Sequence, residues 1–245
     1  MRRLSCVVLS LCLAACATAG GASSDDVVGD DAPEPDANPN DPPDAEPNDP
    51  PDADTTPQMV TLSQATSPTV VAPNTLVCSS NLNNVPQYTL ENHFYRVFRL
   101  SDFGISTTFT AQRVDFAVED ASTTAGSQTV TVRLHTMSGS TLTNASLTLL
   151  YGQNVLINDT ASATIPVTLT TPVVVPAGST LVLELFAPAH STQGNFFYPG
   201  SNTSGESGPS YVRADGCSIT EPSTYATVAP AEMVHLIMSV TGTKP

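Results

Sequence analysis

The feature that most constrains the fold is an alternation of apolar and polar residues in six stretches between residues 113 and 240. A period of two places every second side chain on one face, as in a β-strand with one buried and one solvated face. The alternation therefore predicts strands of an antiparallel sheet or sandwich. The apolar positions are Val114, Phe116 and Val118; Val130, Val132 and Leu134; Leu147, Leu149 and Tyr151; Ala163, Ile165, Val167 and Leu169; Leu181, Leu183 and Leu185; and Val234, Leu236, Met238 and Val240.

Small turn-forming residues separate these stretches, as in Ala125-Gly126-Ser127, Ser138-Gly139-Ser140 and Pro176-Ala177-Gly178-Ser179. Such clusters form hairpins and short loops. No window has a convincing 3.6-residue period, so we expect no helix longer than a turn or two. Many short strands at regular spacing predict an all-β domain, an antiparallel β-sandwich of jelly-roll-like topology, with a closed barrel as the alternative.

A second region has a composition that opposes folding. Residues 25–54 contain twelve acidic side chains, no lysine or arginine, and an eight-residue unit repeated at 36–43 and 44–51. The segment has almost nothing apolar to bury, so it is predicted to stay disordered. Its prolines and mutually repelling carboxylates favour an extended, stiff chain. We interpret residues 16–57 as a disordered, Asp- and Pro-rich tether.

The N-terminus has the order of features found in export signals. Arg2 and Arg3 precede a short apolar run that ends in Leu13-Ala14-Ala15-Cys16. This layout resembles the signal peptide of bacterial lipoproteins, which is cleaved before a lipidated cysteine. The resemblance implies a signal peptide over 1–15, fatty acyl chains such as palmitate on Cys16, and a membrane partner through that lipid. An ordinary cleavage after Ala19 is the alternative.

These features divide the chain into a signal peptide (1–15), a tether (16–57) and a folded domain (58–245). The domain segment carries eleven acidic and six basic residues, for a net charge of −5. It contains no basic run that could neutralise phosphates, so we expect no nucleic-acid partner. Localisation at the cell envelope follows from the export signal, and Ala17 after the cysteine resembles lipoproteins sorted to the outer membrane.

Cysteine usage agrees with export. Cys6 and Cys12 leave with the signal peptide and Cys16 takes the lipid, so Cys78 and Cys217 remain. An even pair in an oxidising compartment predicts a disulfide between them. A metal or redox pair is the weaker alternative, because the two cysteines have no CxxC spacing and no neighbouring histidine.

Four segments of the domain resemble an accessory β-sandwich domain that is often appended to secreted bacterial peptidases and surface proteins. The resemblance covers about 58–242, includes both Cys78 and Cys217, and implies a non-catalytic module. The segments that carry it are Glu91–Ile105, Val175–Leu185, Gly194–Asn202 and Pro209–Cys217.

Catalytic motifs are not evident in the sequence. The four histidines are scattered without the paired spacing of a zinc site, and there is no Gly-x-Ser-x-Gly motif. We therefore expect no enzyme activity, no catalytic metal and no cofactor. Structural calcium is a weaker hypothesis, since loops of exported sandwiches can hold hard cations with carboxylates. The candidate carboxylates are Asp115, Glu119, Asp120 and Asp215.

Aromatic and polar residues gather in a glycine-rich region near the C-terminus. Aromatic faces beside amides and charges suit a sugar-binding surface, and the candidate ligand residues are Phe197, Tyr198, Asn202, Tyr211 and Arg213. The alternative is that alternate residues of 195–198 simply pack in the sandwich. Two functions are therefore expected: a structural or protein-interaction module that binds an envelope protein, or a lectin-like module that binds a glycan or matrix.

Overall fold

The computed structural model describes residues 56–83 and 85–245. The expected signal peptide, the lipidated Cys16 and nearly all of the tether lie outside the described residues. None of the helices within the described ranges is long and apolar enough to cross a membrane.

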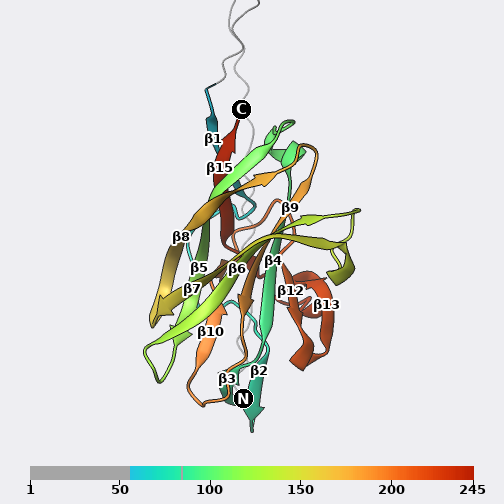
Figure 1. Cartoon of the computed structure of the whole chain (residues 1–245). Helices are drawn as coiled ribbons and strands as arrows, with labels where there is room; N and C mark the ends of the chain where they lie inside the picture. Colours follow the sequence, from blue (N-terminus) through green and yellow to red (C-terminus); the bar gives the residue numbers. More distant parts are fainter. Residues whose placement is uncertain (1–55, 84) are drawn as a thin grey trace, which may run out of the picture. The chain divides into compact units, whose positions relative to one another are not determined.

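The described residues form an antiparallel β-sandwich, which confirms the predicted fold class (Figure 1). The chain passes from one main sheet to the other at most connections between β4 and β10, as in a jelly roll. One sheet contains β1 (Gln58–Ser63), β15 (Met238–Lys244), β5 (Phe109–Ser122), β8 (Thr160–Val175) and β10 (Phe196–Pro199). The other has the order β13 (Ile219–Thr224), β12 (Tyr211–Ala214), β4 (Asn92–Arg99), β9 (Thr180–Ala187), β6 (Ser127–Met137) and β7 (Leu147–Asn158).

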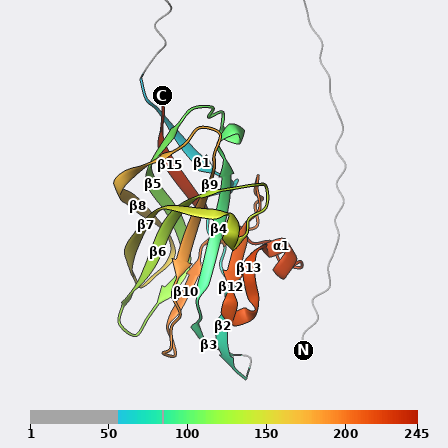
Figure 2. The same cartoon turned by 45° about the vertical axis from the view of Figure 1, so that its right-hand side comes forward.

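Short elements complete the domain. Two small ladders pair β2 (Ser79–Leu82) with β3 (Val85–Thr89), and β11 (Ser201–Asn202) with β14 (His235–Leu236). The short helix α1 (Tyr225–Val228) follows β13 and lies beside it (Figure 2). This agrees with the expectation of no long helix. The 3-10 turns are η1 (Leu100–Phe103), η2 (Asn144–Ser146) and η3 (Asp215–Cys217).

Strand β5 organises the five-stranded sheet because it pairs with three strands. β8 pairs with β5 along almost the whole length of β5. On the opposite edge, β15 pairs with residues 110–116 and β10 with residues 118–122. β1 then adds to the outer side of β15, with Gln58 opposite Lys244. The last strand of the chain, β15, therefore lies between β1 and β5.

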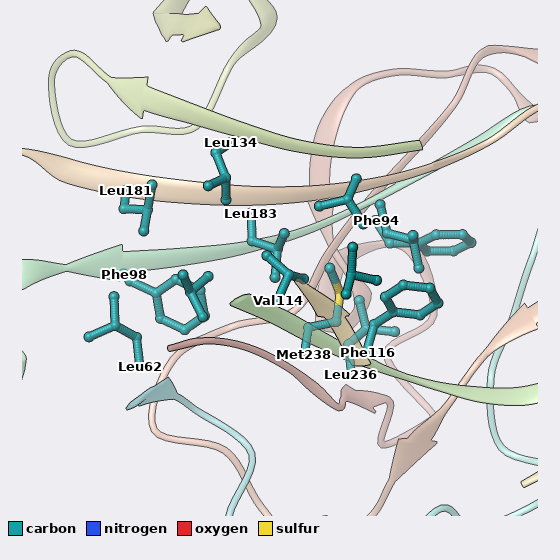
Figure 3. Packing of buried hydrophobic residues seen from close by; sticks show 14 of the residues in the cluster. Leu62, Phe94, Phe98, Val114, Phe116, Leu134, Leu181, Leu183, Leu236 and Met238 are labelled. Carbon is teal, nitrogen blue, oxygen red and sulfur yellow. The ribbon is translucent and has the colours of Figure 1, made fainter. Parts of the chain in front are cut away.

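The core fills the space between the two sheets, as the alternation predicted for most of its positions. The exception is the stretch 147–151, where Leu147 and Leu149 lie on the outer face next to a register shift in the pairing of β6 with β7. Figure 3 shows Leu134, Leu181 and Leu183 of the six-stranded sheet facing Val114 and Phe116 of the other. Each is at most 1% exposed. Burying a large apolar side chain stabilises a domain by about 1.5–3 kcal/mol, so this layer supplies the main favourable term.

The disulfide between Cys78 and Cys217 is present, with a Cα–Cα separation of 5.8 Å. It joins the residue before β2 to the last residue of η3, two positions that are 139 residues apart. Closing so long a loop restricts the unfolded chain and stabilises the folded state, by about 5 kcal/mol in the chain-entropy account.

Candidate functional site

A group of charged side chains occupies the outer face of the six-stranded sheet. His93 on β4 and Glu184 on β9 alternate with core residues of their strands, so they point away from the sandwich interior. Pairing places Arg133 of β6 opposite Glu184, and Arg213 of β12 opposite His93. Four neighbouring strands, β6, β9, β4 and β12, thus contribute to one cluster (Figure 1).

Glu184 is the centre of this cluster and is 3% exposed. Its Oε1 accepts hydrogen bonds from His93 Nδ1 at 2.6 Å and from Arg133 Nη1 at 2.8 Å. Its Oε2 accepts one from His135 Nε2 at 2.7 Å. Burial by itself would raise the pKa of Glu184, but the two histidine hydrogen bonds and the Arg133 charge outweigh it and lower the pKa to about 2. Glu184 is therefore an ionised carboxylate with both oxygens hydrogen-bonded.

His93 links Glu184 to Arg213. Arg213 Nη2 lies 2.5 Å from His93 Nε2, and a guanidinium can only donate, so this nitrogen is the acceptor. The ring proton then resides on Nδ1, which donates to Glu184. Glu91 Oε1 lies on the rim, 3.1 Å from His93 Nε2 and 3.9 Å from Arg213 Nη2.

The loop between β6 and β7 forms one wall of the site. Thr143 caps η2 by a reciprocal pair of hydrogen bonds with Ser146. Asn144 donates to Glu221 Oε2 and Thr220 O at 2.8 and 2.9 Å, which ties the loop to β13. Its Oδ1 accepts from Arg213 Nη1 at 3.1 Å. The loop therefore fixes Arg213 from above the sheet.

Below the loop, a second hydrophobic cluster supports this wall. It contains Tyr95, Met137, Leu142 and Val182, with Tyr211 packed against it. Burial, and then the Glu184 charge, raise the pKa of the Tyr95 hydroxyl, which keeps it protonated.

The charged cluster around Glu184 surrounds a shallow hollow of about 260 Å³. Within the described residues, Arg133 makes a hydrogen bond only through Nη1, and its guanidinium lies 4.3 Å over the Phe186 ring. His135 Nδ1 and Arg213 Nε are buried atoms without a hydrogen-bond partner there. The hollow thus combines unused donors with an unused acceptor. Its lining residues are His93, Tyr95, Arg133, His135, Asn144, Leu147, Leu149, Glu184 and Arg213.

The five ligand residues predicted from the sequence are not brought together. Arg213 lines the hollow, and Tyr211 packs against the hydrophobic cluster that supports the wall of the hollow. Phe197 and Asn202 are buried, at 1% and 0% exposed, and Asn202 donates to Ser67 O. Tyr198 lies on β10 in the other sheet. Phe197 therefore packs in the sandwich, as the alternative interpretation of residues 195–198 predicted.

The other members of the cluster were missed by sequence reasoning. His93, Arg133, His135 and Glu184 sit at outward positions of apolar strands, where a charged residue usually signifies a solvated face. Glu184 within the run 181–185 was the strongest available signal, since the surrounding residues are apolar. Identifying the site required knowing which strands are neighbours.

The carboxylates considered for calcium have separate partners. Asp115 pairs with Arg113, and Glu119 accepts from the backbone N–H groups of Asn74 and Thr75. Asp120 accepts from Ser122. Across residues 56–83 and 85–245, no three His, Cys, Asp or Glu side chains form a group that could hold a metal ion.

Comparison with known proteins gives little guidance. No family model matches the chain, and no curated protein matches it. A solved structure of infectious bursal disease virus, Gx strain, aligns with 10% sequence identity and a TM-score of 0.24. The alignment covers 77% of this chain and 40% of the viral chain. A similarity this low carries no inference about function.

Proposed function

We propose that this chain is a lipid-anchored protein of the bacterial cell envelope that displays a non-catalytic β-sandwich binding module. The observation that carries the binding role is the hollow on the outer face of the six-stranded sheet, where four strands place charged groups around Glu184. The lipoprotein-like signal sequence that ends at Cys16 supports the anchoring role, and the acidic tether supports display away from the membrane.

The arrangement around Glu184 supports binding rather than catalysis. A general acid or base works best with a pKa near the operating pH, whereas the pKa of Glu184 is about 2. Nucleophilic catalysis by a hydroxyl or thiol needs an adjacent base. In the described part of the chain, no histidine ring hydrogen-bonds to a serine, threonine or cysteine side chain; the rings contact Glu91, Glu184, Arg213, Gln128 and the backbone of Gly205.

Between the two expected binding roles, the hollow favours a glycan or matrix polymer over a protein partner. A protein interface requires a large, well-packed patch, commonly about 800 Å² on each side. The hollow is small and lined by hydrogen-bonding groups, which suits one polar residue of a polymer. A structural or protein-interaction role remains the second candidate, with exposed Leu149 and Leu156 on the edge strand β7 in its favour.

Anchoring is tested by metabolic labelling with a clickable fatty acid in a bacterial host. The full chain is expected to take up label and to fractionate with membranes, whereas Cys16→Ser abolishes both. Cys12→Ser is the matched control, because this cysteine lies within the predicted signal peptide and its loss leaves labelling intact. An unlabelled, membrane-free wild-type chain contradicts the anchoring proposal.

Binding is tested with the unlipidated Cys16→Ser chain against envelope polysaccharides and against membrane-protein extracts. Saturable binding to a polysaccharide supports the glycan role. Co-purification of one stoichiometric protein, without polysaccharide binding, supports the second candidate instead.

A further inference from the structure

We infer that the hollow binds an acidic sugar, a uronic-acid residue of a polysaccharide, with Arg133 donating to its carboxylate and His135 accepting from one of its hydroxyls. This inference rests on the proposed binding function and names its ligand class. The juxtaposition that carries it is an arginine with free donors beside a histidine whose second ring nitrogen has no partner among the described residues, and both residues line one hollow.

Arg133 is placed to receive a carboxylate. Its side chain is 29% exposed, and only Nη1 is engaged, by Glu184 at 2.8 Å. The Phe186 ring lies 4.3 Å from the guanidinium carbon and holds the planar group from one side. Nε and the second amino group remain for a ligand, and the guanidinium fork binds carboxylates with two parallel hydrogen bonds.

His135 distinguishes a sugar from a simple anion. Its Nε2 is 2.7 Å from the ionised Glu184 and donates to it, which leaves Nδ1 as an acceptor. Nδ1 is buried without a partner, and its side chain is 10% exposed. Leaving such a group unpaired costs about 1–3 kcal/mol. A sugar hydroxyl can donate to Nδ1, whereas a fully ionised phosphate or sulfate has no proton to give.

The opposite end of the hollow favours hydroxyls over a second negative charge. Arg213 is already engaged by His93 and Asn144, and the carboxylates of Glu91 and Asp215 each lie 3.9 Å from its nitrogens. These carboxylates lie beside Arg213 and outside the lining of the hollow, and their charges repel further anions at this end. The ligand therefore carries its carboxylate at the Arg133 end and hydroxyls at the Arg213 end.

The size and overall charge are consistent with this ligand. A hollow of about 260 Å³ is below the usual range of about 300–1,000 Å³ for drug-sized pockets and fits a single sugar residue of a longer chain. The domain segment has a net charge of −5, so bulk attraction to a polyanion does not operate and recognition must be local.

The test measures binding of oligogalacturonate to the full chain with Cys16→Ser by isothermal titration calorimetry. Methyl-esterified oligogalacturonate is the matched ligand, because it keeps the sugar backbone and removes the charge. We expect binding of the free acid and at least tenfold weaker binding of the ester. Arg133→Gln is expected to weaken binding at least tenfold, and Arg133→Lys to weaken it less, because the charge stays and the fork is lost.

Arg113→Gln is the matched control variant. Arg113 lies on the outer face of β5, its side chain is 51% exposed and it pairs with Asp115, so the variant loses the same charge far from the hollow. Its affinity is expected to equal that of the parent chain. Thermal unfolding of each variant separates loss of binding from loss of fold.

Several outcomes overturn the inference. These are equal affinity for the acid and the ester, equal weakening by Arg113→Gln and Arg133→Gln, or tighter binding of polyphosphate than of oligogalacturonate. Absence of uronate binding also overturns it. That last result leaves the proposed function standing if another polysaccharide or a protein partner binds, and it does not affect labelling at Cys16.

Discussion

Two ion clusters in this domain have similar composition and opposite character. Inside the sandwich, Arg96 is 0% exposed and donates to the carbonyls of Leu236 and Gly208 and to Glu206 Oε2. Glu206 also accepts from the backbone and the hydroxyl of Ser210. On the outer face, Glu184 holds Arg133, whose Nε and second amino group stay unused.

The difference separates a structural role from a binding role. Arg96 joins the loop 204–210 to β14 with protein partners alone, so its cluster has nothing left for a ligand. The Glu184 cluster satisfies the carboxylate but leaves donors of Arg133 and an acceptor of His135 unpaired. The guanidinium of Arg133 is partly exposed, so its Nε and second amino group can donate to a ligand at the surface.

The largest effect is expected from Arg96→Met. Removing one partner of a buried ion pair leaves the Glu206 carboxylate without its counter-charge and the Leu236 and Gly208 carbonyls without the Arg96 donor, which costs about 3–5 kcal/mol. Urea unfolding should show this loss in the free energy of unfolding. Arg113→Met, at an exposed pair, should leave it nearly unchanged, because solvent screens that pair. Similar losses of unfolding free energy for the two variants would contradict a structural role for Arg96.

A smaller loss, about 2–3 kcal/mol, is expected from Glu184→Gln. The neutral amide removes the charge that Arg133 faces and offers a donor where His135 also donates. The same unfolding measurement should show Glu91→Gln within about 1 kcal/mol of the parent, because the Glu91 side chain is 44% exposed. A larger effect at Glu91 than at Glu184 would contradict the assignment of Glu184 as the centre.

Acid should weaken the outer cluster in a defined range. The pKa of Glu184 falls from its ordinary value of 4.5 to about 2 on folding. A lowered pKa in the folded state stabilises the protein fully above 4.5, and this contribution disappears as the pH falls towards 2. It amounts to about 3 kcal/mol by linkage. Unfolding curves of wild type and Glu184→Gln should therefore converge between pH 4.5 and 2; parallel curves would refute the lowered pKa.

The smallest effect on stability, below about 1 kcal/mol, is expected from Arg133→Gln. Its guanidinium is partly exposed and makes one ion pair among the described residues, so solvent replaces much of what is lost. Thermal unfolding and uronate titration of the same sample should show nearly unchanged stability and at least tenfold weaker binding. A variant that loses stability like Glu184→Gln would make Arg133 a structural residue.

The sequence was sufficient for the fold class and the disulfide. Alternation marked the inward positions, such as Phe116 and Leu183, and counting left Cys78 and Cys217 as the only pair. It was insufficient for the site, because His93 and Glu184 meet across 91 residues through strand order and register. Alternation also could not separate Phe197, which packs in the core, from an exposed aromatic residue.

The position of β15 between β1 and β5 sets the order in which the domain can assemble. During synthesis, β1 emerges long before residues 238–244, and within the described part of the chain β1 pairs only with β15. A nascent chain that stops before Met238 lacks an interior strand of the five-stranded sheet, and the edge of β5 over residues 110–116 has no strand to pair with. The five-stranded sheet is therefore completed only when the last strand of the chain has been synthesised.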